Sequence, residues 1–206
     1  MTDAQRAFVI LGHKAALTSD FTLNDLPGAG GRLDILARCV TSALCLSHGM
    51  RADTDVYLIL QDQITVRFEG AHVKRLNPDE RSTGALVKHA LKALEAGRSR
   101  STPGVTVARR GLADVLRELD EAGCTVHVLD EGGQDVRDAS LAAPIAFVLS
   151  DHQDFSSSEA TRLAAYGRLS LGPKVLQADP CIAIVHNELD RRALDWRHEP
   201  VRLIRS

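Results

Sequence analysis

The sequence is poor in aromatic residues and in the closely spaced cysteine and histidine pairs that bind metals. Aromatic residues make up 4% of the 206 residues, so Leu, Val, Ile and Ala must fill most of the core. The four cysteines, Cys39, Cys45, Cys124 and Cys181, form no CxxC pair, and no two histidines have HxH or HxxxH spacing. We therefore expect no metal site.

Long hydrophobic stretches are also absent. No apolar run approaches the roughly 18 residues that cross a membrane, and the N-terminal segment lacks the pattern of a signal peptide. The net charge of −2 provides no overall attraction for nucleic acid, so any RNA contact must come from a local group of basic residues. These absences predict a cytoplasmic protein with reduced thiols and no membrane contact.

Two familiar nucleotide-binding and hydrolase motifs are missing as well. The glycine-rich segment 27–31 follows a polar, irregular stretch instead of a buried strand, so we interpret it as a loop before a helix. Neither a GxxxxGK[ST] motif nor a GxSxG motif occurs in the chain. The chemistry must therefore be sought in less regular groups of residues.

What the sequence does contain is an alternation of apolar strands with amphipathic helices. The expected strands cover residues 6–12, 55–61, 64–70, 105–109, 124–130, 144–150 and part of 167–172. The first expected helix begins at Arg32, presents an apolar stripe of Leu33, Ala37, Val40 and Leu44, and stops near Gly49. The other expected helices begin at Asn77 as cap, at Gly111, at residue 157 and at Asp179, and a turn is expected at 131–133. This alternation predicts an α/β domain with a largely parallel sheet, in which 55–61 and 64–70 pair as a hairpin.

The stretch 178–192 combines two patterns. Its β-branched start resembles a buried strand, whereas its charged second half resembles a helix. We interpret it as one helix, with Asp179 as its cap and Pro180 in its first turn. The apolar stripe of this helix consists of Ile182, Val185, Leu189 and Ala193. Ile184 lies off this stripe, so the start of the helix should be buried on more than one face. The charged half should face solvent or a second subunit.

Polar residues follow two of the expected strands. His13 comes after the strand 6–12, and His152 comes after the strand 144–150. Ligands of open α/β sheets bind beyond the carboxyl ends of strands, so both histidines are candidates for a site. Each is also compatible with a solvated loop position.

Basic residues gather near two expected helix starts. One group is Arg32 and Arg38, and a looser group contains Lys74, Arg75 and Arg81. Arginines near a helix start suit phosphate binding, although an ordinary charged surface would look the same in the sequence.

Five blocks of the sequence resemble the archaeal-type tRNA (pseudouridine-N1)-methyltransferases, a family of the knotted SPOUT class. The blocks are RAFVILGHKA (6–15), GRLDILARCVTSALCLSHGMR (31–51), LNPDERSTGALVKHAL (76–91), FVLSDHQDF (147–155) and LSLGPKVLQADPCIAIVHNELDRR (169–192). They occur in the order found in the family and extend over nearly the whole chain.

The resemblance implies a single SPOUT domain over residues 1–206, with a trefoil knot at about 124–206. It further implies a homodimer that binds tRNA and methylates N1 of pseudouridine 54 in the T-loop. S-adenosyl-L-methionine would be the cofactor, S-adenosyl-L-homocysteine the product, and no metal would be needed. The implied contacts with the cofactor are Leu149, Ser150, Leu171, Gly172 and onward to Leu176, and Cys181.

The chain departs from the family at two positions of one loop. Ser150 and Asp154 stand where the family usually has glycine, and a side chain there restricts the backbone and narrows the approach to a ligand. A homologue that acts on another RNA, or that only binds RNA, is therefore an alternative function. Without the resemblance, a small-molecule α/β enzyme would be a further alternative.

Methyl transfer from a sulfonium to a ring nitrogen depends mainly on alignment of the reactants. The ring N–H must also lose its proton, which calls for a nearby carboxylate or histidine. Asp34, Asp151 and His152 are the candidates for this catalytic step. Three arginines are expected to hold RNA phosphates: Arg32, Arg38 and Arg81.

Overall fold

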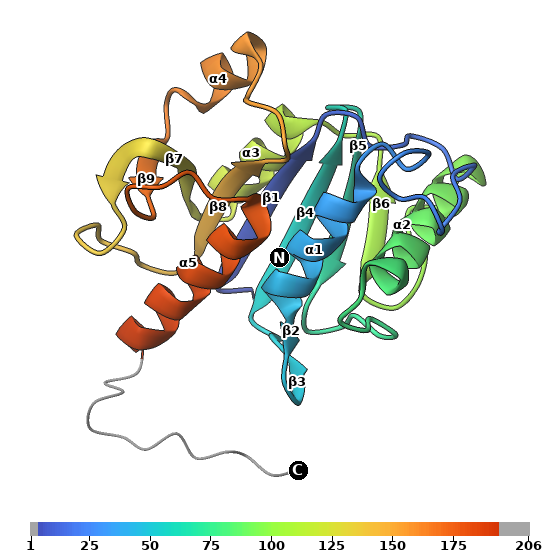
Figure 1. Cartoon of the computed structure of the whole chain (residues 1–206), viewed down its shortest axis with the longest axis horizontal. Coiled ribbons are helices and arrows are strands. Elements are labelled where there is room, and N and C mark those ends of the chain that lie inside the picture. Colours follow the sequence, from blue (N-terminus) through green and yellow to red (C-terminus); the bar gives the residue numbers. More distant parts are fainter. Residues whose placement is uncertain (1–3, 194–206) are drawn as a thin grey trace.

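The computed structural model describes residues 4–193 and shows one sheet with helices on both faces (Figure 1). The seven strands of this sheet lie in the order β6-β5-β4-β1-β8-β7-β9. They are β1 (Arg6–Gly12), β4 (Thr54–Leu60), β5 (Ile64–Glu69), β6 (Val105–Ala108), β7 (Thr125–Asp135), β8 (Ile145–Ser150) and β9 (Gly167–Ser170). A separate ribbon pairs β2 (Cys45–Leu46) with β3 (Gly49–Met50).

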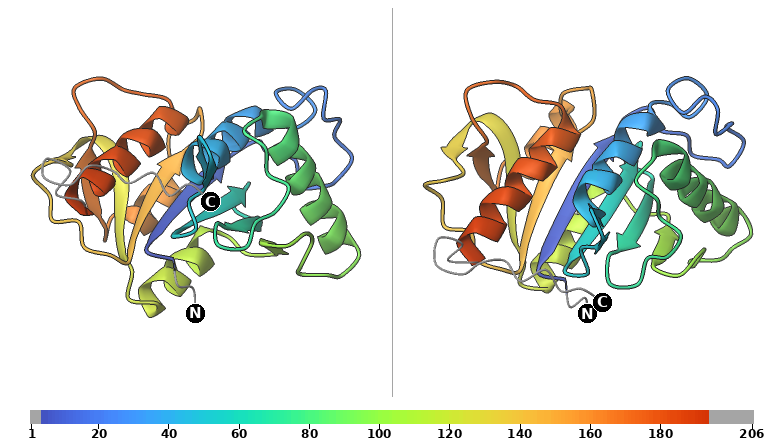
Figure 2. Two further views of the ribbon diagram at one scale, coloured as in Figure 1. Left: turned by 90° about the horizontal axis from the view of Figure 1, so that it is seen from below. Right: turned by 60° about the horizontal axis from the view of Figure 1, so that its bottom comes forward.

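In the described part of the chain, five helices cover the sheet. They are α1 (Leu33–Leu44), α2 (Glu80–Glu95), α3 (Leu112–Glu121), α4 (Ser157–Leu163) and α5 (Ala178–Ala193). α1, α2 and α5 pack on one face, and α3 and α4 pack on the other (Figure 2). Within residues 4–193, no helix is both long and apolar enough to cross a membrane.

The central strands β4, β1 and β8 are almost entirely buried because helices cover both of their faces. β1 pairs in parallel with β4 and with β8, and Phe8 stacks on its register partner Phe147 with ring centroids 5.6 Å apart. β7 and β9 extend the parallel part, whereas β5 and β6 pair antiparallel. The predicted largely parallel sheet and its hairpin are therefore confirmed.

α1 and α5 begin at the same edge of the sheet and pack side by side (Figure 2). α1 follows β1 and α5 follows β9, and these two strands run in the same direction. The apolar stripe predicted for α1, which ends at Leu44, is buried. Both helix starts consequently lie near the carboxyl ends of parallel strands, where α/β proteins bind ligands.

Two predicted features of helices were wrong. α2 is capped by Asp79, whose carboxylate accepts a hydrogen bond from the backbone N–H of Ser82, and not by Asn77. α1 ends at Leu44, where the chain turns into the short ribbon, instead of continuing towards Gly49.

α5 also differs from its prediction at the start and along its length. It begins at Ala178, so Asp179 lies in the first turn and does not cap the helix. Ile184 is only half-buried, whereas the polar His186 is buried. The charged second half contacts this chain: Asp190 accepts hydrogen bonds from Arg6 at 2.6 Å and from Arg51 at 2.7 Å.

β7 is longer than the sequence predicted. The turn expected at 131–133 is an irregularity inside the strand, because the register with β9 shifts between Leu129 and Gln134. The predicted knot region continues to residue 206, and its segment 194–206 lies outside the described residues.

Candidate active site

A small pocket lies between the bulge of β7, the end of β9 and the start of α5. Its volume is about 90 Å³, and its lining comprises Leu129, Asp130, Glu131, Leu169, Leu171, Gly172, Lys174, Val175, Leu176 and Cys181. Four of the six residues predicted to contact the cofactor belong to this lining, so the structure brings them together. Sequence reasoning missed Asp130 and Glu131, which precede the glycine pair of the bulge.

The two other predicted cofactor residues, Leu149 and Ser150, end β8 and do not line this pocket. β8 and β9 are not neighbours, because β7 lies between them. Leu149 is buried in the core on the α5 side of the sheet. The Ser150 hydroxyl donates a short hydrogen bond to the carbonyl of Gln153, which closes the turn after β8.

Cys181 is half-buried in the pocket wall. Burial raises the pKa of its thiol, and the nearby carboxylate of Asp179 raises it further. The thiol is therefore neutral near pH 7, which suits a small apolar wall of the pocket and not a nucleophile. Gly172 has a φ of 141°, a backbone conformation that favours glycine.

A second polar group surrounds the start of α1. Arg32 has a left-handed backbone (φ 68°), and its Nε and Nη2 donate to the two carboxylate oxygens of Asp34, each at 3.0 Å. Arg38 donates to Asp34 at 3.3 Å. The Asp34 side chain is 7% exposed, and burial alone would raise its pKa, but the hydrogen bonds and charges of Arg32 and Arg38 together outweigh burial and lower the pKa. Asp34 is therefore an ionised carboxylate in a fixed orientation.

Arg38 lies among three carboxylates. Besides Asp34, its Nη1 donates to Glu80 at 3.0 Å, and its Nε lies 3.7 Å from an oxygen of Asp179. That buried Asp179 oxygen accepts no hydrogen bond from the described residues. The guanidinium of Arg38 is thus already paired with carboxylates of this chain. Its binding to an RNA phosphate stays a prediction.

The looser basic group lies on the surface at the start of α2. Lys74, Arg75 and Arg81 are exposed, and none of them forms an ion pair with another residue of the described range 4–193. Arg81 donates a hydrogen bond to the side chain of Asn24 at 2.5 Å. These three cations are therefore available to an external anion.

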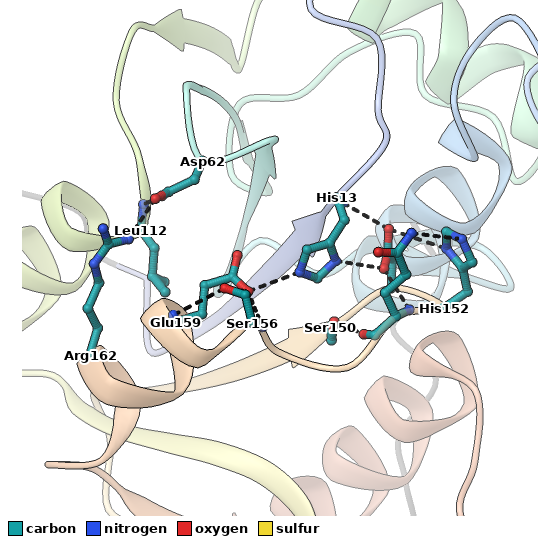
Figure 3. Close-up of polar contacts among 10 residues, drawn as sticks. His13, Asp62, Leu112, Ser150, His152, Ser156, Glu159 and Arg162 are labelled. Atoms are coloured by element: carbon teal, nitrogen blue, oxygen red, sulfur yellow. Dashed lines mark hydrogen bonds and ion pairs between the residues drawn. The ribbon is translucent and has the colours of Figure 1, made fainter.

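Asp151 joins a third polar group at the carboxyl ends of β1 and β8. Its carboxylate accepts hydrogen bonds from the backbone N–H of His13 at 3.0 Å and from that of Gln153 at 2.9 Å. The two ring nitrogens of His13 lie 2.9 Å from Asp151 and 3.0 Å from Glu159, so His13 bridges two carboxylates (Figure 3).

The Asp151 side chain is 1% exposed and held by several donors, so it fixes the loop after β8. The His152 ring lies on the other side of Asp151 from His13 and is more accessible; its Nδ1 lies 3.4 Å from Asp151 (Figure 3). Sequence reasoning missed Glu159, which caps α4 with Ser156. The sequence around it, SSSE, has the form of a capping box, and that local signal alone does not predict a contact with His13.

A family model described as "Putative SAM-dependent RNA methyltransferase" matches residues 5–194 of the chain. The chain belongs to this family. A relative from Haloarcula marismortui, named tRNA (pseudouridine(54)-N(1))-methyltransferase, is 49% identical over 191 residues, which cover 90% of this chain and 96% of the relative. A relative of the same name from Methanocorpusculum labreanum is 45% identical over 194 residues, with the same coverage.

The fold of this SAM-dependent RNA methyltransferase family member also has a counterpart among solved structures. Nep1 of Archaeoglobus fulgidus, solved with S-adenosylhomocysteine, matches with a TM-score of 0.66 and 19% identity, over 92% of this chain and 100% of that chain. At this identity the match shows the fold alone. The family resemblance and the SPOUT-type α/β fold inferred from the sequence are confirmed.

Proposed function

We propose that the protein transfers the methyl group of S-adenosylmethionine to N1 of pseudouridine 54 in tRNA and releases S-adenosylhomocysteine. The observation that carries the proposal concerns the first turn of α5. This turn contacts the polar group at the start of α1 and also lines the pocket. Asp179 lies beside Arg38 of the α1 group, and Cys181 lines the pocket whose residues match the expected cofactor contacts.

The lining of the pocket offers groups that suit parts of the cofactor. Leu171, Leu176 and Cys181 provide apolar walls for a flat base, while Asp130 and Glu131 provide acceptors for hydroxyl or ammonium groups. Bound S-adenosylmethionine supplies an electrophilic methyl group on a positively charged sulfur. The protein must align the nitrogen acceptor with that methyl group, and such alignment can supply about 7–11 kcal/mol of the barrier at best.

Asp34 is our first choice for the group that contacts the ring N1–H. Its low pKa keeps it ionised, so it can accept a hydrogen bond from the N–H and take up the proton as the new N–C bond forms. Arg32 holds both of its oxygens and fixes its direction. His152, the more accessible residue after β8, is the second choice, and we assign Asp151 to holding that loop.

The tRNA would be held by exposed or partly exposed cations near the starts of α1 and α2. Arg81, together with Lys74 and Arg75, forms the exposed basic group at the start of α2, and Arg32 lies 35% exposed beside Asp34. A T-loop base is buried in folded tRNA, so it must be extruded to reach a protein pocket. Binding through phosphates should weaken as the salt concentration rises.

The remaining family properties are part of the same proposal. We expect a cytoplasmic homodimer in which the second subunit completes each site, and a single domain whose C-terminal part is knotted. In Figure 1, β9 lies at the edge of the sheet, and α5 follows it and packs beside α1.

The test is a methylation assay with the full chain, S-adenosylmethionine and two tRNA transcripts. One transcript carries pseudouridine at position 54 and the other carries uridine, whose N1 is bonded to ribose and cannot be methylated. We expect N1-methylpseudouridine by nucleoside mass spectrometry from the first transcript alone. Tight tRNA binding without any methylated nucleoside would favour the RNA-binding alternative, and binding of neither tRNA nor cofactor would refute the proposal.

A further inference from the structure

Arg38 of α1 contacts carboxylates on three helices. Its guanidinium contacts one carboxylate on α1, one on α2 and one on α5, at 3.3 Å from Asp34, 3.0 Å from Glu80 and 3.7 Å from Asp179. The side chain is 32% exposed, so these contacts are only partly screened by solvent. The planar fork of arginine can serve several acceptors at once, which a lysine ammonium cannot do with the same geometry.

Each of the three carboxylates lies in or beside a different functional part of the proposed enzyme. Asp34 is the proposed contact with the ring N–H, and Asp179 lies two residues before Cys181 in the wall of the cofactor pocket. Glu80 is the first residue of α2 and directly precedes the exposed Arg81. Arg38 therefore connects the acceptor group, the cofactor pocket and the proposed RNA surface.

Arg32, the neighbouring cation at the start of α1, cannot replace Arg38 in this position. Both donor groups with which Arg32 reaches the cluster already bind Asp34. Without Arg38, three carboxylates would face one another with a single compensating cation, and like charges at such distances repel. The start of α5 would then move away from α1, and Cys181 would move with it.

We propose that Arg38 is a positioning residue that fixes the start of α5, and with it the wall of the cofactor pocket, relative to Asp34. This inference rests on the proposed function, and it assigns Arg38 a different role from the phosphate contact that its sequence position suggested. The two roles differ in what they affect. A phosphate contact affects tRNA affinity, whereas a positioning residue affects cofactor affinity and the rate at saturation.

The first test compares Arg38→Met with Arg81→Gln and Arg117→Gln in the full chain. Arg81 belongs to the proposed RNA surface, and Arg117 is an exposed residue of α3 that pairs only locally with Asp114. For Arg38→Met we expect kcat at saturating tRNA and cofactor to fall about 10- to 100-fold, the effect of a misplaced reacting group. We also expect S-adenosylhomocysteine to bind several-fold more weakly in calorimetry without RNA.

The salt dependence of tRNA binding separates the two roles. Loss of one phosphate contact lowers the slope of log affinity against log salt by about 1, which we expect for Arg81→Gln but not for Arg38→Met. Arg117→Gln should change neither quantity. A lowered slope in Arg38→Met, with unchanged kcat and cofactor affinity, would overturn the inference and leave the proposed function intact.

A second variant tests the ion pair itself. Asp179→Asn removes one of the negative charges that Arg38 compensates, so in the Arg38→Met background it should recover part of the lost cofactor affinity. If Arg38→Met does not fold, Arg38→Lys keeps the charge and should still lower kcat, because an ammonium cannot span the three carboxylates. Wild-type kcat in Arg38→Lys, or no recovery in the double variant, would contradict the role given to Arg38. Inactivity of the wild-type chain would instead refute the proposed function.

Discussion

The bridge formed by His13 leads to a stability prediction with a definite magnitude. His13 lies between Asp151 and Glu159 at 2.9 and 3.0 Å, and all three side chains are largely buried. Hydrogen bonds that involve charged groups contribute about 1.5–3 kcal/mol each. Both carboxylates keep backbone donors when the imidazole is removed, so we take the lower value for each bond. His13→Ala should then lower the free energy of unfolding by about 3 kcal/mol.

The effect should depend on pH, and its sign follows from the two pKa shifts. Burial lowers the pKa of His13, but the hydrogen bonds with Asp151 and Glu159 outweigh burial and raise it. This contribution is complete below the unfolded pKa of about 6.5 and is lost as the pH rises through the folded pKa. Burial raises the pKa of Glu159, but the hydrogen bonds with His13 and Ser156 together outweigh burial and lower the pKa, so that contribution is lost in acid.

Thermal unfolding at pH 5.5 and pH 9 measures this difference directly. At pH 5.5 we expect His13→Ala to lower the melting temperature by roughly 6–12 °C, since 1 kcal/mol corresponds to about 2–4 °C in a domain of this size. His72→Ala is the control. His72 is exposed and lies 3.5 Å from Glu69, farther than His13 from its partners, so its ion pair should contribute less than about 0.5 kcal/mol. A loss that is equal at both pH values, or no larger than that of the control, would refute the reasoning.

Four further substitutions test the site and its support. Asp34→Asn should lower kcat about 10²- to 10⁴-fold in the methylation assay, because a neutral amide cannot take up the N1 proton. Cys181→Phe should abolish S-adenosylhomocysteine binding in calorimetry while the melting temperature stays near that of the wild type, because the ring fills the small pocket. Gly31→Ala should destabilise the protein by about 2 kcal/mol or more in urea unfolding, because φ is +63° and the new Cβ would lie 1.8 Å from the carbonyl of Lys14. Phe147→Ala should lower the free energy of unfolding by about 3–5 kcal/mol, since its ring is fully buried against Phe8.

The sheet could be predicted because its signal is local. The strands of residues 6–12 and 144–150 are continuous apolar runs, which is the pattern of parallel strands covered on both faces. The cap of α2 was assigned incorrectly because Asn77 and Asp79 both suit a cap, and only the hydrogen bond with Ser82 decides between them.

The expected cofactor contacts came from the family resemblance and not from local patterns. Leu171, Gly172, Leu176 and Cys181 do line one pocket, but the contributions of Asp130 and Glu131 depend on a bulge in β7 that turn residues alone do not indicate. The partners of Arg38 lie on other helices, and the distance between them is set by helix packing that the pattern of one helix does not reveal.

α5 shows why position along the chain is not enough to define the pocket. At its start, Asp179 lies beside Arg38, and further along, His186 contacts α1 and β1. Burial and the charges of two nearby arginines lower the pKa of His186 to about 4, so its ring is neutral and donates from Nε2 to the carbonyl of Ala43 while Nδ1 accepts from Arg6. The strand-like composition that made this stretch ambiguous is thus the buried side of a helix fixed at several points. Those contacts determine where Cys181 stands in the pocket wall.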